Sequence, residues 1–330
     1  MRTRVVLGVV LLTLAACGQP EGGTVEFVVP EGVSFTAVSD TLHERGLVRW
    51  TSLFGIYARM QGADRAIKAG RYALPRGATW GTILRALTEG RVVTVSLTIP
   101  EGFRLAQMVT PIAALTGRSE EDVAATLRRQ GVDSVMGVPG PGLEGYLFPD
   151  TYRFAPGVSP EVVLRTLVDR YRSVWTRGRR ARLDALGMTE REIVTLASII
   201  QAEARHAEEM PKISSVYHNR LDLGWLLQAD PTVLYALGGP RDRLLFAAID
   251  SVADDPYNTY TQRGLPPGPI GAPGEAAIDA ALYPADEEFL YFVARIDGSH
   301  TFSRTLAEHN RAVAEARRER ARASTGDSGS

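Results

Sequence analysis

The residue best placed for chemistry is Glu203, an ionisable side chain on the apolar face of an expected helix. Thr189 and Glu192 fit a capping box, which predicts that the helix begins directly after Thr189. An apolar stripe at helical spacing follows, made of Ile193, Leu196, Ile199 and Ile200. Glu203 continues this stripe, and a carboxyl group withdrawn from water has a raised pKa because desolvation penalises its charged form. Such a glutamic acid stays protonated near neutral pH and can act as a general acid.

A purely structural role is the alternative for Glu203. Arg205 and Arg220 are close enough in sequence to neutralise its charge, and a buried ion pair needs no catalytic purpose. The apolar pattern continues to Ala207 and Met210, and we expect Glu203 to lie on the apolar face near the end of the helix. The sequence blocks downstream decide between the two roles.

Several blocks around Glu203 follow one another in a characteristic order. They read LEGYLFPDTY at 143–152, LASIIQAEA at 196–204, SVYHNRL at 215–221, LQADPTVLY at 227–235, YNTY at 257–260, GLPPGPI at 264–270, YFVA at 291–294 and HTFS at 300–303. In this order the blocks resemble those of the YceG-like endolytic murein transglycosylases, and the resemblance covers residues 25–313.

The resemblance implies an α+β fold, with a small LysM-like N-terminal region and a larger mixed α/β catalytic domain. It also implies the acid/base role of Glu203. The second glutamate of the family's ExE pair is catalytic, and the pair reads Gln201-x-Glu203 here. The change at Gln201 suggests either that this position is supportive rather than essential or that activity is reduced.

The implied reaction cuts nascent peptidoglycan strands internally, between N-acetylmuramic acid and N-acetylglucosamine, and so terminates strand elongation. Most glycosidases need two carboxyl groups. In the implied reaction the muramic acid's own 6-hydroxyl attacks and closes a 1,6-anhydro ring, and a nucleophile on the same sugar has a large effective molarity. Glu203 alone would protonate the leaving oxygen and then accept the proton of the 6-hydroxyl.

Further substrate-binding residues are expected within the matching blocks. They are Glu144, Asn219, Gln228, Asp230, Tyr257, Asn258 and Tyr260. Amides and carboxylates suit sugar hydroxyls and N-acetyl groups, and aromatic faces stack on sugar rings, although tyrosines are also common in cores. Structural roles stay open for three of them. Asn219 can bond a helix end, Asp230 can cap a helix before Pro231, and Glu144 can organise its aromatic segment.

The N-terminus predicts export followed by lipid attachment. Arg2 and Arg4 precede an apolar run at 5–16 that is too short to span a bilayer as a helix. LAAC at 14–17 resembles a lipobox, and Cys17 is the only cysteine. We therefore expect a lipoprotein in the cell envelope, facing the periplasm or the cell exterior, on either the inner or the outer membrane. An ordinary signal peptide with an incidental cysteine is the alternative, and the family commonly uses a transmembrane helix instead.

The remaining chain divides into segments of different character. We expect a lipoprotein signal peptide at 1–16, a tether at 17–24, a LysM-like region at 25–110, a catalytic domain at 111–313 and a flexible tail at 314–330. Three strand–turn–helix units, with Pro-x-Gly turns at 30–32, 75–77 and 100–102, build the LysM-like region. Whether this region binds glycans or is a spacer stays open.

Other functional classes are disfavoured by composition and motifs. A formal net charge of −1 gives no footprint for a nucleic-acid partner. We expect no cofactor and no metal, since no nucleotide loop stands out and the five histidines (His43, His206, His218, His300 and His309) lack a compact ligand spacing. The expected partners are glycan strands and a membrane; a peptidoglycan synthase follows from the family alone. A non-catalytic peptidoglycan-binding lipoprotein remains the alternative function.

Overall fold

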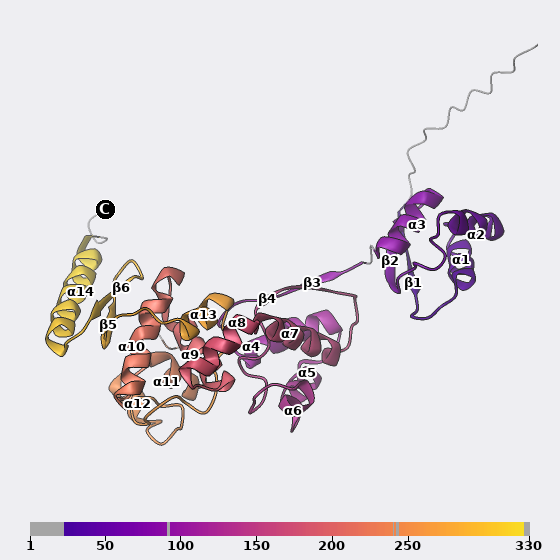
Figure 1. Ribbon diagram of the computed structural model, residues 1–330. Coiled ribbons are helices and arrows are strands. Elements are labelled where there is room, and N and C mark those ends of the chain that lie inside the picture. Colours follow the sequence, from indigo (N-terminus) through magenta and orange to yellow (C-terminus); the bar gives the residue numbers. More distant parts are fainter. Residues whose placement is uncertain (1–22, 91–92, 240, 242–243, 327–330) are drawn as a thin grey trace, which may run out of the picture. The chain divides into compact units, whose positions relative to one another are not determined.

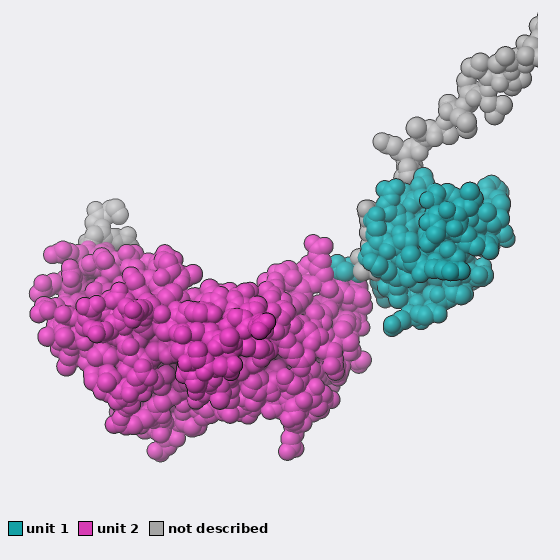
Figure 2. Space-filling view, in the orientation of Figure 1, with its two compact units in different colours: residues 1–94 teal, residues 95–330 magenta. Residues whose placement is uncertain are grey.

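The structure is a computed structural model that describes residues 23–90, 93–239, 241 and 244–326, in two compact units (Figures 1 and 2). Unit 1 ends at Thr94 and unit 2 begins at Val95. The expected signal peptide and the lipidation site at Cys17 lie outside the described residues. Within the described part of the chain, no helix is both long and apolar enough to cross a membrane.

Unit 1 is a small α+β domain. Its elements are β1 (Thr24–Val29), α1 (Phe35–Glu44), α2 (Thr51–Met60), β2 (Gly70–Pro75) and α3 (Trp80–Glu89). The two strands pair antiparallel, with Phe27 opposite Tyr72, and alternate residues of β1 point into the core. The rings of Phe27 and Tyr72 stack with centroids 5.5 Å apart, and the helices cover them with apolar residues such as Leu42, Phe54 and Leu87.

Unit 2 contains the remaining elements. They are β3 (Val95–Ile99), α4 (Leu105–Thr116), α5 (Glu120–Leu127), α6 (Val132–Met136), β4 (Asp150–Phe154), α7 (Pro160–Val174), α8 (Arg177–Leu186), α9 (Glu190–Glu203), the 3-10 turn Ala207–Glu209, α10 (Met210–Asp222), α11 (Asp230–Ala236), α12 (Phe246–Asp250), α13 (Glu275–Leu282), β5 (Tyr291–Ala294), β6 (His300–Ser303) and α14 (Leu306–Gly326). Helix α9 is central, because α10, α11 and α13 all pack against it (Figure 1). The fold is therefore mixed α/β, with small two-stranded antiparallel sheets.

The unit boundary differs from the boundary expected at residue 110. All three strand–turn–helix units form, but the third one, β3 and α4, belongs to unit 2. The reason is long-range pairing: β3 runs antiparallel to β4, with Leu97 opposite Tyr152. The three units have similar local sequences, so only the partner strand separates the third from the first two.

Helix α9 begins where the sequence predicts. The Thr189 hydroxyl accepts from the Glu192 amide at 3.2 Å, and a Glu192 carboxylate oxygen accepts from the Thr189 amide at 2.7 Å. This reciprocal pair confirms the capping box and fixes the register that places Glu203.

Glu203 lies at the end of α9, as expected, although the apolar pattern runs on to Met210. The helix ends at Glu203, because Ala204 adopts an extended conformation with ψ of 128°. A new helix, α10, then begins at Met210 with Pro211 in its first turn, a position that proline favours and that a helix interior excludes. Glu203 is consequently the last residue of α9 rather than a residue inside a longer helix.

The C-terminal tail expected from residue 314 begins as part of a helix. Helix α14 extends to Gly326 and lies beside β5 and β6 (Figure 1). Ala316 is buried, and Arg320 donates to the carbonyl oxygen of Ala294 at 2.8 Å. Arg295 and Glu319 form an ion pair at 3.3 Å. These contacts hold the helix against the β5–β6 hairpin.

Candidate active site

Glu203 lines a pocket of about 320 Å³ in unit 2. Residues from the ends of α9 and α11, from α10, from the β5–β6 hairpin and from α14 surround it, together with Tyr260. These residues are far apart in the sequence. The fold therefore assembles the pocket around the glutamate that ends the central helix.

Tyr217 is the direct partner of Glu203. It lies on α10, is fully buried, and donates from its hydroxyl to Glu203 Oε1 at 2.9 Å. The ring of Phe292 packs edge-on against it, with centroids 5.9 Å apart at 88°. Tyr217 is therefore packed in place and orients the carboxyl group through Oε1.

The surroundings of Glu203 place its pKa near neutrality. Burial raises the pKa to about 7, since the charged form loses hydration. The hydrogen bond from Tyr217 lowers the pKa, the negative charge of Asp230 raises it, and the positive charge of Arg220 lowers it. Desolvation dominates, so the group exists in both protonation states near pH 7, as an acid/base catalyst requires.

The expected structural alternative, an ion pair between Glu203 and an arginine, is not formed among the described residues. Arg220 is buried but is committed to backbone carbonyl groups. Its Nε donates to Leu290 O at 2.8 Å and one terminal nitrogen donates to Leu227 O at 2.6 Å. Arg220 therefore links the residue before β5 to the loop before α11. It affects Glu203 through its positive charge.

Three of the expected substrate-binding residues line this pocket: Gln228, Asp230 and Tyr260. The Tyr260 hydroxyl donates to Asp230 Oδ1, and Asp230 does not cap α11, because its N-cap residue is Ala229. Gln228 has a φ of 49°, a left-handed conformation that is uncommon outside glycine, and its amide donates to Thr259 O at 3.0 Å. The pocket thus contains a second carboxylate, Asp230, held in place by a tyrosine.

Both expected asparagines make hydrogen bonds to backbone carbonyl groups. Asn219 donates from Nδ2 to Glu287 O at 2.8 Å and to Phe289 O at 2.9 Å. Asn258 is fully buried and donates to Ile249 O and Val252 O, each at 3.0 Å. Each amide ties a loop to the fold, and neither lines the Glu203 pocket.

Glu144 and Tyr257 do not line the pocket, and both contact Tyr235. Glu144 accepts from the Leu105 amide at 3.1 Å, at the start of α4, and from the Tyr235 hydroxyl at 3.3 Å. Tyr257 packs against Tyr235 with ring centroids 4.8 Å apart. Burial raises the pKa of Glu144 to about 7, as it does for Glu203.

Tyr217, Phe292, His300 and His309 also line the pocket, although the sequence did not single them out as site residues. His300 bonds through Nδ1 to Glu209 Oε2 at 2.8 Å. His309 stacks on Tyr291 with centroids 5.2 Å apart, and its Nδ1 has no hydrogen-bond partner within the described chain. The YFVA and HTFS blocks point to the hairpin, whereas no sequence signal marks His309.

A larger pocket, of about 730 Å³, lies beside the start of α9 and contains Glu192. That carboxylate is committed to the capping box with Thr189. Among the described residues, no group of three or more His, Cys, Asp and Glu side chains is placed to hold a metal ion. The Glu203 pocket therefore offers the better acid/base chemistry.

Gln201, at the first position of the ExE pair, makes a structural hydrogen bond. Its Oε1 accepts from the Gly274 amide at 3.0 Å, and the side chain does not line the Glu203 pocket. A carboxylate could accept the same bond, since both groups offer an sp² oxygen. The first position of the pair thus supports the segment before α13.

Comparison with known proteins gives the family. The sequence pattern of the YceG-like family matches residues 27–315. The chain belongs to the YceG-like family. The match covers both units and includes Glu203.

Two transglycosylases and one crystal structure are similar to this chain. An endolytic murein transglycosylase of Bacillus subtilis (strain 168) is 34% identical over 306 residues, which is 88% of this chain and 84% of that protein. An endolytic murein transglycosylase of Streptococcus pneumoniae serotype 2 (strain D39 / NCTC 7466) is 29% identical over 320 residues, and the match spans 57% of its length. The crystal structure of a YceG-like protein from Listeria monocytogenes is similar with a TM-score of 0.60 and 33% identity, covering 88% of this chain and 99% of that one.

Proposed function

We propose that this protein is an endolytic murein transglycosylase in which Glu203 is the acid and the base. The observation that carries the proposal is the Glu203 carboxyl group, with a pKa of about 7, in a pocket formed by the family's sequence blocks. The names of the relatives in B. subtilis and S. pneumoniae support the same reaction.

The reaction proceeds in two proton transfers at one carboxyl group. Protonated Glu203 donates to the glycosidic oxygen, and the bond from that oxygen to the muramic acid's anomeric carbon breaks. The 6-hydroxyl of the same sugar attacks this carbon, and ionised Glu203 accepts the hydroxyl proton. The products are a 1,6-anhydro-N-acetylmuramic acid end and a new N-acetylglucosamine end, with no water consumed.

The pocket supplies the remaining requirements of this mechanism. Tyr217 occupies Glu203 Oε1, which leaves Oε2 for the moving proton. Positive charge develops on the sugar ring as the bond breaks, and the carboxylate of Asp230 stabilises such charge in a partly desolvated site. Gln228 and Tyr260 line the same pocket and provide polar groups for the sugar hydroxyls or N-acetyl groups.

The proposed substrate is nascent, uncrosslinked peptidoglycan, cut within the strand so that its elongation ends. The protein acts in the cell envelope, attached through a lipid on Cys17, and a peptidoglycan synthase is an expected partner. Incorporation of labelled palmitate should be lost in Cys17→Ala. Persistent labelling of that variant would contradict the anchor.

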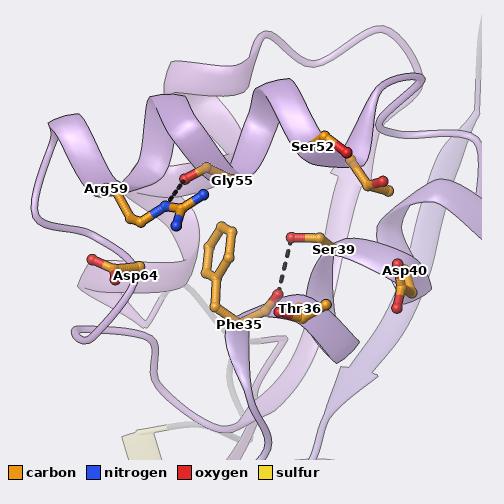
Figure 3. A pocket seen from close by; sticks show the side chains of 9 residues that line it. Phe35, Thr36, Ser39, Asp40, Ser52, Gly55, Arg59 and Asp64 are labelled. Carbon is orange, nitrogen blue, oxygen red and sulfur yellow. Dashed lines mark hydrogen bonds between the residues drawn. The ribbon is translucent and has the colours of Figure 1, made fainter.

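Unit 1 is proposed as a LysM-like glycan-binding module. Its helices α1 and α2 lie between its two paired strands in the chain, and a pocket of about 280 Å³ opens between these helices (Figure 3). Hydroxyl and charged side chains line it, including Thr36, Ser39, Asp40, Ser52 and Arg59. Arg59 Nε donates to Gly55 O at 3.2 Å and Ser39 donates to Phe35 O at 2.9 Å, so these two side chains are already oriented.

The deciding experiment is mass spectrometry of the products from purified glycan strands, for the wild type and Glu203→Gln. Internal cuts that end in 1,6-anhydro-N-acetylmuramic acid, absent in the variant, are the expected result. Reducing ends would indicate hydrolysis, with Asp230 as the group that activates water. Binding without cleavage by the wild type would favour the non-catalytic alternative.

A further inference from the structure

Helix α2 of unit 1 presents a row of large apolar side chains to solvent. Trp50, Leu53, Ile56 and Met60 are 57%, 52%, 49% and 81% exposed. With 3.6 residues per turn, the helical positions 53, 56 and 60 fall within one sixth of the helix circumference. Trp50 is the N-cap residue of α2 and directly precedes its first turn. We call these four residues the α2 stripe.

The α2 stripe is not needed for the core of unit 1. Phe54 and Ala58, on another side of α2, are fully buried and supply its contact with the rest of the unit. A third side carries Ser52, Gly55 and Arg59, which face the polar pocket (Figure 3). Single exposed apolar residues are common, but a contiguous row marks an interaction surface.

The charges around the α2 stripe favour an anionic, lipid-like partner. The segment that contains the stripe carries Arg45, Arg49 and Arg59, and Glu44 and Asp64 flank it on either side. The guanidinium of Arg49 lies 5.5 Å from the ring centroid of Trp50. Tryptophan beside arginine, on a helix with an apolar face, is the composition of a helix that lies in the headgroup region of a bilayer.

The position of unit 1 in the chain brings it to the membrane. Cys17 precedes Thr24, the first residue of β1, by seven positions. Seven residues reach at most about 25 Å, even when fully extended. A lipid on Cys17, as in the proposed function, would therefore keep unit 1 within contact distance of the bilayer surface.

We propose that the α2 stripe is a membrane-contact surface that inserts at the headgroup level of an anionic bilayer. The apolar side chains enter the boundary of the acyl chains, while Arg45 and Arg49 meet lipid phosphates. This inference rests on the anchored location within the proposed function, and it goes beyond the reaction. Its consequence is that unit 1 is oriented by two attachments, a lipid and a protein surface, instead of one.

The test measures binding to vesicles without any covalent lipid. The chain from residue 17 onward, carrying Cys17→Ser, is sedimented with vesicles of phosphatidylethanolamine and phosphatidylglycerol, and with phosphatidylcholine vesicles as the neutral reference. The test variant is Leu53→Ser/Ile56→Ser/Met60→Ser. The matched control is Leu245→Ser/Phe246→Ser, which removes side chains that are 54% and 83% exposed in unit 2.

We expect the parent chain and the control to bind the anionic vesicles, and the test variant to partition on the order of tenfold more weakly or worse, because the lost apolar area drives insertion. Binding to phosphatidylcholine should be weaker for all three. Trp50 fluorescence should shift to shorter wavelength on vesicles, and the shift should vanish in Trp50→Phe.

Three outcomes would overturn the proposal. The parent chain fails to bind vesicles, the test variant binds as well as the parent, or light scattering reveals a dimer that the test variant dissolves, which would assign the α2 stripe to a second copy of the chain. Glu203→Gln should bind vesicles like the parent, and the α2 variant should still cut glycan strands in solution. Failure of the reaction and failure of the membrane contact are thereby separated.

Discussion

Glu203 and Glu144 are two partly buried glutamates of unit 2 whose pKa values are both raised to about 7 by desolvation. Their surroundings differ in what remains free. Both oxygens of Glu144 accept hydrogen bonds, from the Leu105 amide and the Tyr235 hydroxyl. Glu203 accepts one bond among the described residues, from Tyr217, and lines a pocket that also contains Asp230.

The comparison teaches that a raised pKa does not by itself identify a catalytic acid. Burial shifts both groups, but among the described residues only Glu203 has an oxygen without a protein partner beside a pocket that could hold substrate. Glu144 instead lies at the N-terminus of α4, where a negative charge is stabilised by the helix dipole. Replacing individual groups tests whether this difference decides the function.

The largest difference is expected between Glu203→Gln and Glu144→Gln. Loss of the acid/base should reduce strand cleavage by about 10²–10⁴-fold, since that is the range of general acid–base contributions. Glu144→Gln should keep activity within about tenfold, because its oxygens bind α4 and α11 rather than substrate. Quantified 1,6-anhydro products check both. Equal losses of cleavage activity in the two variants would contradict the assignment of Glu203, rather than Glu144, as the acid/base.

The position of Glu203 on the apolar face of its helix could be predicted from the sequence. The capping box and the apolar stripe located Glu203 and its environment, because both depend on local spacing. The sequence blocks also contained Gln228, Asp230 and Tyr260, which the fold brings to the pocket. How these blocks meet depends on packing between helices, which local spacing does not encode.

Other parts of the site could not be predicted for identifiable reasons. Asn219 and Asn258 carry amides that suit a sugar or a backbone carbonyl equally well, and only the folded chain shows that they bond carbonyls. Tyr217 belongs to the apolar side of α10, and its contact with Glu203 depends on how α10 packs on α9. The strand β3 looks like β1 and β2, and its partner β4 lies more than fifty residues away.

A smaller but still large effect is expected for Asp230→Asn. Removing this charge takes away stabilisation of the positive sugar ring, and we expect roughly tenfold to a hundredfold lower kcat. The charge of Asp230 raises the pKa of Glu203, so that pKa should fall in the variant and the alkaline limb of the pH–rate profile should move to lower pH. Tyr260→Phe is the control, since it removes the hydrogen bond and keeps the charge. An unchanged alkaline limb in Asp230→Asn would contradict this electrostatic link.

Tyr217→Phe should have an intermediate effect with the opposite shift in pH. The lost hydrogen bond held the carboxyl group in place and favoured its ionised form. We expect kcat to drop on the order of three- to tenfold, given the usual net free energy of an intramolecular hydrogen bond, and the alkaline limb to move to higher pH. Tyr235→Phe, which removes the corresponding bond to Glu144, should leave the limb in place. A shift in both variants, or in neither, would argue against Tyr217 as the positioning residue.

Stability should also separate the two glutamates. Folding raises the Glu203 pKa from its ordinary 4.5 to about 7, so the folded state binds the proton more tightly. This contribution is present below about pH 4.5 and is lost as pH rises through 7. The wild type loses this contribution between pH 5 and pH 8, whereas Glu203→Gln has no such group to titrate. The free energy of unfolding of the variant, relative to the wild type, should therefore be about 1–3 kcal/mol higher at pH 8 than at pH 5.

Glu144→Gln should change by a similar amount between the two pH values, because burial also raises the pKa of Glu144 to about 7. It should nevertheless be less stable than Glu203→Gln at both pH values, because an amide cannot accept both of the bonds that Glu144 accepts. Urea unfolding of unit 2 at pH 5 and pH 8 measures these differences. Equal stability of the two variants would mean that the hydrogen bonds of Glu144 contribute little.

The smallest effect is expected for Gln201→Glu. The glutamate restores the family's ExE pair and can keep the bond to the Gly274 amide, so activity should change by less than about twofold. Gln201→Leu, which removes the acceptor, is the matched comparison and should lower the melting temperature. A large rise in activity for Gln201→Glu would show that the first position acts directly in the chemistry.

The order of elements along the chain has a further consequence. One wall of the Glu203 pocket comes from α14, through His309, and α14 is synthesised after every other described element. A chain that stops before Leu306 lacks this wall. The pocket around Glu203 is therefore complete only once the last described element has been translated.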